Sequence, residues 1–213
     1  MEKSEKLGAE TNLDASNEVL CRYASHLRDS IAEIDAWSRE ENIKVRYVSG
    51  LMVTRKNPET QRLEVLLVKG GGKDFWQFPG GHVHPREDHI AALYREIKQE
   101  LGVSILPDLY YVKTYVPELK TDEPKPDSVL AIHAFALPGD SDWDLKKGNI
   151  KLGSDVDRVD WTDDPLREAD GNPRVLTEQT DYLLRQVMGY DGPLNKNTNP
   201  NYTQYYGRPR REK

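Results

Sequence analysis

The segment from about Pro85 to Leu101 has the most regular pattern in the chain and constrains the fold more than any other. Apolar residues recur at steps of three and four, which places them on one face of an α-helix: Ile90, Tyr94, Ile97 and Leu101. Pro85 suits the first helical turn, and Gly102 suits the position that ends a helix. The pattern predicts an amphipathic helix over residues 85–101 that packs its apolar face on a core.

The polar face of this helix carries Glu96, Gln99 and Glu100, which are neighbours because helical positions three and four apart lie side by side. Two carboxylates in one place repel each other unless a cation lies between them. Mg²⁺ is usually held by one or two carboxylates together with waters and substrate phosphates. On these residues alone, the face is either a solvated helix surface or a metal site.

The same stretch resembles the Nudix box, whose pattern is G-x5-E-x7-R-E-U-x-E-E-x-G-U, where U is a bulky aliphatic residue. All specified positions but one are matched, by Gly81, Glu87, Arg95, Glu96, Ile97, Glu100, Gly102 and Val103. The exception is Gln99, which stands where the family has glutamate. The strands predicted on either side also look like the layout of the family, which extends the resemblance to about residues 44–188.

This resemblance implies an α/β/α sandwich with a mixed sheet. It also implies hydrolysis of a nucleoside diphosphate linked to another group, with Mg²⁺ or Mn²⁺ as cofactor. Glu96 and Glu100 would bind the metal, and the carbonyl oxygen of Gly81 would be a further ligand. Arg95 would orient the glutamates, and Glu87 would pair with Arg95 across the loop–helix junction. The catalytic base would be Glu96 or a carboxylate from a later loop.

Gln99 is the departure from the family pattern that matters for the site. Its amide oxygen can still bind a metal but carries no charge, so we expect weaker metal binding or fewer metals, and a lower turnover. A carboxylate from elsewhere would compensate for the missing charge. The sequence leaves several candidates open: Glu118, Asp122, Glu123, Asp155 and Asp157.

Substrate contacts are predicted for residues next to the box, namely Gly80, Lys73, His82 and Trp76. Lys73 follows three glycines that lack the P-loop pattern, so this segment is either a flexible turn or a phosphate contact. Trp76 is either a core residue or a platform for a base. His82, His84 and His89 together suggest zinc, but their spacing fits no standard zinc pattern. A solvated loop or a phosphate contact is the better interpretation of these histidines.

The rest of the chain predicts strands and helices around this segment. Strands are expected over residues 44–53, 63–68, 75–78, 109–116, 128–137 and 156–161, and the first two are expected to pair as a hairpin. Further helices are expected over residues 16–41 and 175–188. We therefore expect a mixed sheet with helices on both faces. The predicted divisions are a polar segment and helix at 1–43, a Nudix domain at 44–189 and a disordered tail at 190–213.

Composition bears on partners and location. The formal net charge of −6 argues against duplex nucleic acid as the main partner, though not against a small nucleotide. Cys21 is the only cysteine, which excludes an intramolecular disulfide and suits a reducing compartment. No apolar run is long enough for a membrane helix, and residues 1–6 do not resemble a signal or transit peptide. A cytoplasmic protein is expected.

The favoured function is a metal-dependent pyrophosphohydrolase that acts on a small nucleotide or nucleoside diphosphate derivative. The alternative is a Nudix module that binds a nucleotide or RNA without hydrolysis. Gln99 supports this alternative, whereas the intact Arg95, Glu96 and Glu100 oppose it. The substrate stays open, because Tyr115 and Pro117 resemble different branches of the family at neighbouring positions. The helix at 16–41 is compatible with a homodimer.

Overall fold

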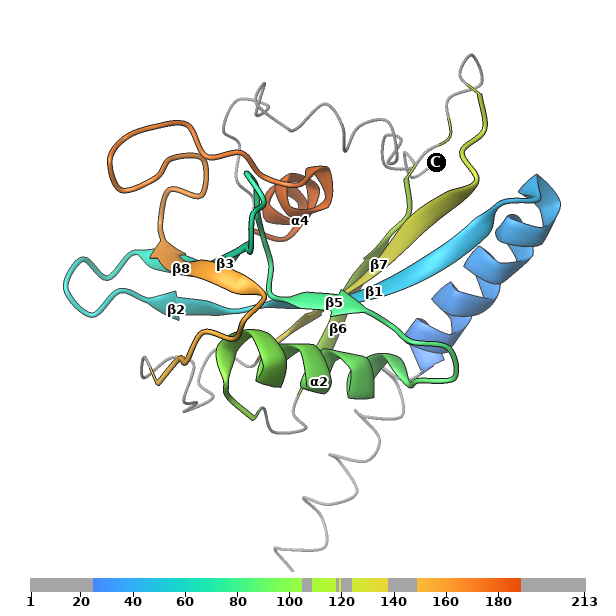
Figure 1. Ribbon diagram of the computed structural model, residues 1–213, viewed down its shortest axis with the longest axis horizontal. Helices are drawn as coiled ribbons and strands as arrows, with labels where there is room; N and C mark the ends of the chain where they lie inside the picture. Colours follow the sequence, from blue (N-terminus) through green and yellow to red (C-terminus); the bar gives the residue numbers. More distant parts are fainter. Residues whose placement is uncertain (1–24, 105–108, 118, 120–123, 138–148, 189–213) are drawn as a thin grey trace, which may run out of the picture.

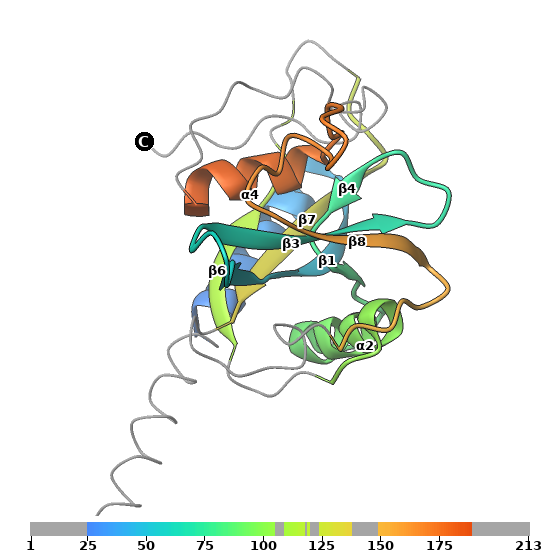
Figure 2. The ribbon, with the colours of Figure 1, turned by 90° about the vertical axis from the view of Figure 1, so that its left-hand side faces the viewer.

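The computed structural model describes residues 25–104, 109–117, 119, 124–137 and 149–188 (Figure 1). Two four-stranded sheets lie between helix α2 (His89–Leu101) and helix α4 (Glu178–Met188), as Figure 2 also shows. The expected α/β/α sandwich is thereby confirmed. The predicted tail at 190–213 and the residues before position 25 lie outside the described residues. Within the described segments, no helix is long and apolar enough to cross a membrane.

The first sheet is mixed, as expected. Its strand order is β5 (Gly80–His82), β1 (Lys44–Met52), β7 (Ser128–Ala136) and β6 (Tyr110–Tyr115). β1 runs parallel to β7, whereas β5 and β6 run antiparallel to their neighbours. β5 therefore forms one edge of this sheet, and it carries Gly80 and Gly81 past the helix that follows them (Figure 1).

The second sheet is antiparallel and is built around β3 (Leu63–Gly70). Its other strands are β2 (Thr54–Lys56), β4 (Trp76–Gln77) and β8 (Val156–Thr162). The predicted hairpin between segments 44–53 and 63–68 is wrong for β1, because only its continuation β2 pairs with β3. The chain passes from one sheet to the other at the fully buried Val53. Strand-like residues continue through this point, so the sequence pattern does not reveal it.

Each helix closes its own apolar core against the sheets. On the α2 side, the core contains Leu93, Ile97 and Leu101, all fully buried. On the α4 side, Leu183 and Leu184 pack with Trp76 and Phe78. Full burial of one such side chain contributes roughly 1.5–3 kcal/mol. A helix at residues 25–41 lies beside β1 and β7 and contributes Leu27 to the α2 core (Figure 1).

Helix α2 begins four residues later than predicted, at His89 instead of Pro85. Asp88 is the N-cap, and its carboxylate accepts hydrogen bonds from the backbone N–H groups of Ile90 and Ala91 at 2.8 and 3.1 Å. The preceding residues form a turn in which Arg86 has a φ of 68°. The predicted end is confirmed, because Gly102 adopts the left-handed conformation and its N–H donates to the carbonyl oxygen of Lys98.

Helix α4 also begins later than predicted, at Glu178 and not at residue 175. The hydroxyl oxygen of Thr177 accepts a hydrogen bond from the N–H of Thr180 at 3.3 Å, which is the geometry of an N-cap. The N–H of Thr177 itself donates to the carbonyl oxygen of Trp76, so the start of α4 is attached to β4. This attachment places the first turn of α4 opposite the β5–α2 junction.

Candidate active site

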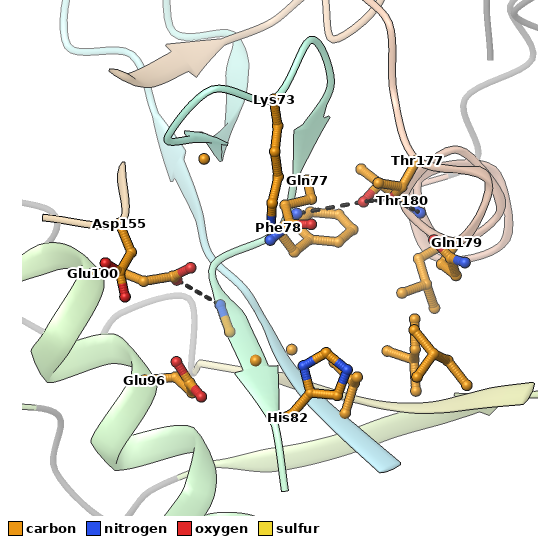
Figure 3. Close-up of a pocket in the computed structure, with 18 residues that line it drawn as sticks. Lys73, Gln77, Phe78, His82, Glu96, Glu100, Asp155, Thr177, Gln179 and Thr180 are labelled. Carbon is orange, nitrogen blue, oxygen red and sulfur yellow. Dashed lines mark hydrogen bonds between the residues drawn. The ribbon is translucent and has the colours of Figure 1, made fainter. Parts of the chain in front are cut away.

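A cavity of about 290 Å³ lies between the β5–α2 junction and the first turns of α4 (Figure 3). Glu96, Glu100 and Asp155 lie together at one side of it, and Lys73 extends toward it from the loop before β4. Gln179 and its neighbours on α4 face the cavity from the other side. Glu96 and Glu100, the two predicted metal ligands, therefore line the same cavity.

Glu100 is held against the strand that precedes its own helix. Its side chain is buried, and its Oε2 accepts a hydrogen bond of 2.7 Å from the backbone N–H of Gly80. This contact needs glycine at position 80, because the backbone has a φ of 140° and a Cβ there would lie 2.1 Å from the carbonyl oxygen of Ser49. The Gly80-Gly81 loop thus fixes one carboxylate of the site.

Glu96 packs over the next glycine. A Cβ atom on Gly81 would lie 2.3 Å from the carboxyl carbon of Glu96, which is closer than real Cβ atoms approach a non-bonded neighbour. The absence of a side chain at position 81 therefore lets this carboxylate lie directly on the backbone of β5. The arrangement places Glu96 beside the peptide group of Gly81, as a shared metal site would require.

The electrostatics of Glu100 fit a bound cation. Burial, followed by the charges of Glu96 and Asp155, raises the pKa of Glu100 to about 8, against the opposing effects of the Gly80 N–H and Lys73. A divalent cation would relieve this repulsion, and carboxylate oxygens are suitable ligands for Mg²⁺. Among the described residues, no group of three or more His, Cys, Asp or Glu side chains forms a ready-made metal cluster. The donor set fits an ion whose remaining ligands are waters and phosphate.

Arg95 connects the parts of the junction. Its guanidinium donates to both carboxylate oxygens of Glu87 at 2.8 Å, and to Oε1 of Glu96 at 2.7 Å. It also donates to the carbonyl oxygen of His82 at 2.9 Å. The hydrogen bonds that Glu87 accepts from Arg95, followed by the one from the N–H of His84, lower the pKa of Glu87 to about 2. Arg95 therefore joins the 82–87 segment to the carboxylate of Glu96 by charge-assisted hydrogen bonds.

Gln99 does not lie with the other predicted metal ligands. Its side chain is exposed, and its Oε1 accepts a hydrogen bond of 3.1 Å from Nη1 of Arg95. It is also absent from the residues that line the cavity. Its amide thus contacts the arginine that holds Glu96. The position at which the family has a charged glutamate therefore does not line the cavity.

The predicted substrate residues fall into two groups. Gly80, Lys73 and His82 line the cavity. Trp76 does not, because it is fully buried in the α4 core and its Nε1 donates to Glu168 at 3.1 Å. Burial is the largest cause of a lowered pKa at His82, which therefore favours the neutral imidazole.

The three histidines considered for zinc do not come together. His82 lines the cavity, whereas His89 makes edge-to-face contacts with Tyr47 and with His133, whose ring centroid is 4.6 Å away. The N–H of His84 donates to Glu87 in the turn before α2.

Several later carboxylates are candidates to compensate for Gln99. Of those within the described residues, Asp155 lines the cavity. Asp157 instead accepts a hydrogen bond from the N–H of Gly72 at 3.0 Å. Glu118, Asp122 and Glu123 lie outside the described residues. Asp155 is held by its own carbonyl oxygen, which accepts from the N–H of Gly71 at 2.9 Å.

Sequence reasoning missed the α4 side of the cavity. Its residues come from the turn before α4, from α4 itself and from β4: Gln77, Thr177, Gln179, Thr180 and Leu183. A weak signal was present, because Thr177, Gln179 and Thr180 are polar residues at the start of a helix with an apolar face. The structure shows that they are buried. Their position opposite Glu96 depends on the path of some eighty intervening residues, which no local pattern encodes.

Comparison with known proteins identifies the family of the chain. The family model of the NUDIX domain matches residues 44–163, more than half of the chain. A 39-residue stretch is 46% identical to an RNA pyrophosphohydrolase of Halorhodospira halophila and covers 18% of this chain. The match spans only 22% of that relative's length.

Two solved structures are among those similar to this chain. A Caenorhabditis elegans Ap4A hydrolase in a binary complex is 22% identical, with a TM-score of 0.45, over 68% of this chain and 96% of that one. A MutT NUDIX hydrolase from Burkholderia pseudomallei is 20% identical, with a TM-score of 0.44, over 68% of this chain and 98% of that one.

Proposed function

Because the chain belongs to the NUDIX domain family, we propose that it is a metal-dependent hydrolase that cleaves the pyrophosphate linkage of a nucleotide or nucleoside diphosphate derivative. The observation that carries this proposal is the group formed by Glu96, Glu100 and Asp155 beside Lys73 in one cavity. Acidic oxygens for a cation and a lysine for phosphate therefore line the same cavity.

In this proposal, Glu96 and Glu100 hold Mg²⁺ or Mn²⁺, and the carbonyl oxygen of Gly81 is a further ligand. The bound ion would neutralise the diphosphate oxygens and lower the pKa of a water molecule. Arg95 keeps the carboxylate of Glu96 in place, and Glu87 anchors Arg95 through two hydrogen bonds. Lys73 places a positive charge at the cavity, where it would contact a phosphate oxygen.

Proton transfer from the attacking water requires a carboxylate near the diphosphate. Glu96 lies within the box and Asp155 outside it, and both line the cavity, so each is a candidate for this role. Asp155 also supplies a negative charge that Gln99 does not. Most of the rate enhancement in such a site comes from positioning and from stabilising charge in the transition state.

The alternative, a module that binds a nucleotide or RNA without hydrolysis, has Gln99 in its favour. The contact between Gln99 and Arg95 weakens that argument, because the neutral side chain lies off the cavity wall. Glutamine in place of glutamate at position 99 leaves Glu96, Glu100 and Asp155 around the same cavity. We therefore expect it to reduce the rate of hydrolysis only slightly. For this reason we favour a hydrolase over a module that only binds.

A screen with Mg²⁺ that separates the nucleotide products by chromatography tests the proposal, because cleavage of a pyrophosphate linkage can yield phosphate esters without free phosphate. The substrates of the screen are nucleoside triphosphates, ADP-ribose, nucleotide sugars and dinucleoside polyphosphates. We expect turnover of at least one, and a loss of about a hundredfold or more in Glu100→Gln. Glu59→Gln, at an exposed turn residue, is the matched control and should leave the rate unchanged. Inertness of the wild type across the panel, with nucleotide binding retained, would establish the binding module instead.

We also propose a cytoplasmic location and a small-molecule substrate, with a homodimer as the assembly to test. The single cysteine supports the first, because it suits a reducing compartment. Light scattering of the full chain tests the homodimer, and fluorescence imaging of the tagged protein tests the cytoplasmic location.

A further inference from the structure

The side of the cavity formed by α4 differs in chemistry from the acidic side. We call it the α4 end and define it by Phe78, Thr177, Gln179, Thr180 and Leu183. The ionisable residues that line the cavity come from β5, α2 and the loops before β4 and β8. Those contributed by α4 and by β7 are amide, hydroxyl or aliphatic side chains. A ligand that fills the cavity therefore meets charge at one end and a neutral surface at the other.

The two threonine hydroxyls of the α4 end are used within the protein. The hydroxyl of Thr177 donates to Oγ1 of Thr180 at 2.8 Å, and that oxygen also accepts a hydrogen bond from the N–H of Phe78 at 3.3 Å. Thr177 additionally caps the helix through the N–H of Thr180. These bonds fix the first turn of α4 against β4 and occupy the acceptor capacity of the Thr180 hydroxyl.

Gln179 is different. It is 3% exposed, and its amide nitrogen Nε2 has no hydrogen-bond partner in the described part of the chain. Buried polar groups in folded proteins almost always have a partner, because an unmade hydrogen bond in the interior is destabilising. Since Gln179 lines the cavity, a molecule bound there, a water or a ligand, is within reach to be this partner.

We propose that the α4 end is a nucleobase subsite, in which the carboxamide of Gln179 hydrogen-bonds the edge of the base. This inference rests on the proposed function and extends it. A carboxamide offers one acceptor and two donors, which complements the adjacent donor and acceptor on a base edge. Phe78 and Leu183 supply apolar lining for the faces of the ring, and the absence of charge at this end disfavours a second phosphate.

The test compares ligands that reach one end or both. Isothermal titration calorimetry would measure AMP, GMP, CMP and UMP, and inorganic pyrophosphate with Mg²⁺, against the wild type and Gln179→Leu. We expect the variant to bind its preferred monophosphate roughly three- to tenfold more weakly, the effect of one hydrogen bond, and to bind pyrophosphate as before. Lys73→Met is the matched comparison and should weaken both classes, because it lies at the phosphate end.

Two readouts separate a ligand contact from a structural role. Gln179→Leu should keep or raise the melting temperature, since it removes a buried donor that lacks a partner. In the ¹⁵N-labelled wild type, the side-chain amide resonance of Gln179 should shift on addition of the monophosphate and stay in place with pyrophosphate. This second measurement decides the question even if the variant does not fold.

The subsite is overturned if no monophosphate binds, if Gln179→Leu binds it as tightly as the wild type, or if both ligand classes weaken equally. A wild type that hydrolyses nothing but shows the Gln179-dependent binding would overturn the proposed reaction alone. The two proposals therefore fail separately.

Discussion

Glu100 holds its carboxyl group where burial, Glu96 and Asp155 raise its pKa to about 8. Near pH 7 and without a cation, this group is therefore largely protonated. A metal ligand must be deprotonated, so binding of Mg²⁺ should release up to about one proton at pH 7. We expect the Mg²⁺ affinity to rise from pH 6 to pH 8 and then to level off. Calorimetry in buffers of different ionisation enthalpy counts the released protons.

Glu100→Gln should abolish the released proton and much of the affinity, because an amide has no proton to lose and no charge. The matched control is again Glu59→Gln, which should show the wild-type dependence on pH. Mg²⁺ binding without proton release at pH 7 would mean that Glu100 is not a ligand.

Gln99 shares the Nη1 atom of Arg95 with Glu96, at 3.1 and 2.7 Å. Gln99→Glu would place a negative charge beside this arginine and return the charge that the family pattern has. We expect a modest gain in metal affinity or turnover, less than about tenfold, because the position is exposed and screened by solvent. Steady-state kinetics with a Mg²⁺ titration measures it. No change in either quantity would show that another residue, with Asp155 the first candidate, already supplies the charge.

At the scale of elements, β7, β1, α2 and the helix at residues 25–41 meet around His133. Its fully buried ring stacks with Tyr47 and contacts His89 at the start of α2. Tyr47 in turn donates to Asp35, which lies on the 25–41 helix, at 2.5 Å. The Nδ1 atom of His133 is 2.6 Å from the hydroxyl of Thr114, whereas Nε2 has no partner among the described residues. This cluster joins the N-terminal helix to the helix that carries the glutamates.

Burial, and secondarily His89, lowers the pKa of His133 to about 3, and burial also lowers that of His89. Both groups are neutral in the folded protein but titrate near 6.5 when unfolded. Their contribution to stability is therefore complete above about pH 6.5 and is lost as the pH falls below it. By pH 5, His133 alone should reduce the free energy of unfolding by about 2 kcal/mol.

Urea unfolding of the wild type and of His133→Asn at pH 7 and pH 5 isolates this loss as the difference between the two proteins. The comparison is needed because Glu100, whose pKa is raised to about 8, becomes more stabilising as the pH falls and acts in both proteins. His133→Asn keeps a polar atom near Thr114 and should lack the His133 loss, although its own stability at pH 7 will be lower. Glu87 does not affect the comparison, because its lowered pKa, about 2, makes its stabilising effect decline only below the ordinary carboxyl range. The same change with pH in both proteins would show that His133 does not cause the loss.

The same elements show what the sequence could predict. The body of α2 and its end at Gly102 follow from periodicity and a glycine, so they were predicted, but its start was not. Pro85 fits a first helical turn, yet Asp88 is the better cap, and Arg86 takes a left-handed conformation that nothing in the sequence announces. Glu96, Glu100 and the two glycines come from one contiguous segment, which is why they were found together. Asp155 and Gln179 reach the cavity only through the tertiary fold.

At the scale of the whole molecule, the cavity lies where two separate cores face each other. Glu96 and Glu100 belong to the helix that closes one core, and Gln179 belongs to the helix that closes the other. A ligand that spans the cavity would therefore contact both layers, whereas a metal ion alone would contact only the α2 side. Ligand binding to the folded state raises stability by mass action, by about 2.7 kcal/mol at a hundredfold excess over the Kd.

A non-hydrolysable nucleoside diphosphate with a methylene bridge, added with Mg²⁺, should raise the melting temperature by about 5–10 °C at such an excess, since 1 kcal/mol corresponds to roughly 2–4 °C for a protein of this size. Differential scanning calorimetry would measure it, with Mg²⁺ alone and the nucleotide alone as references. The combined shift should exceed the sum of the separate ones, because the metal and the diphosphate each complete the other's binding site. Glu100→Gln should lose this excess and keep the shift given by the nucleotide alone. Additive shifts in the wild type would mean that Mg²⁺ and the nucleotide bind at unconnected places. The proposal that both bind in one cavity would then be wrong.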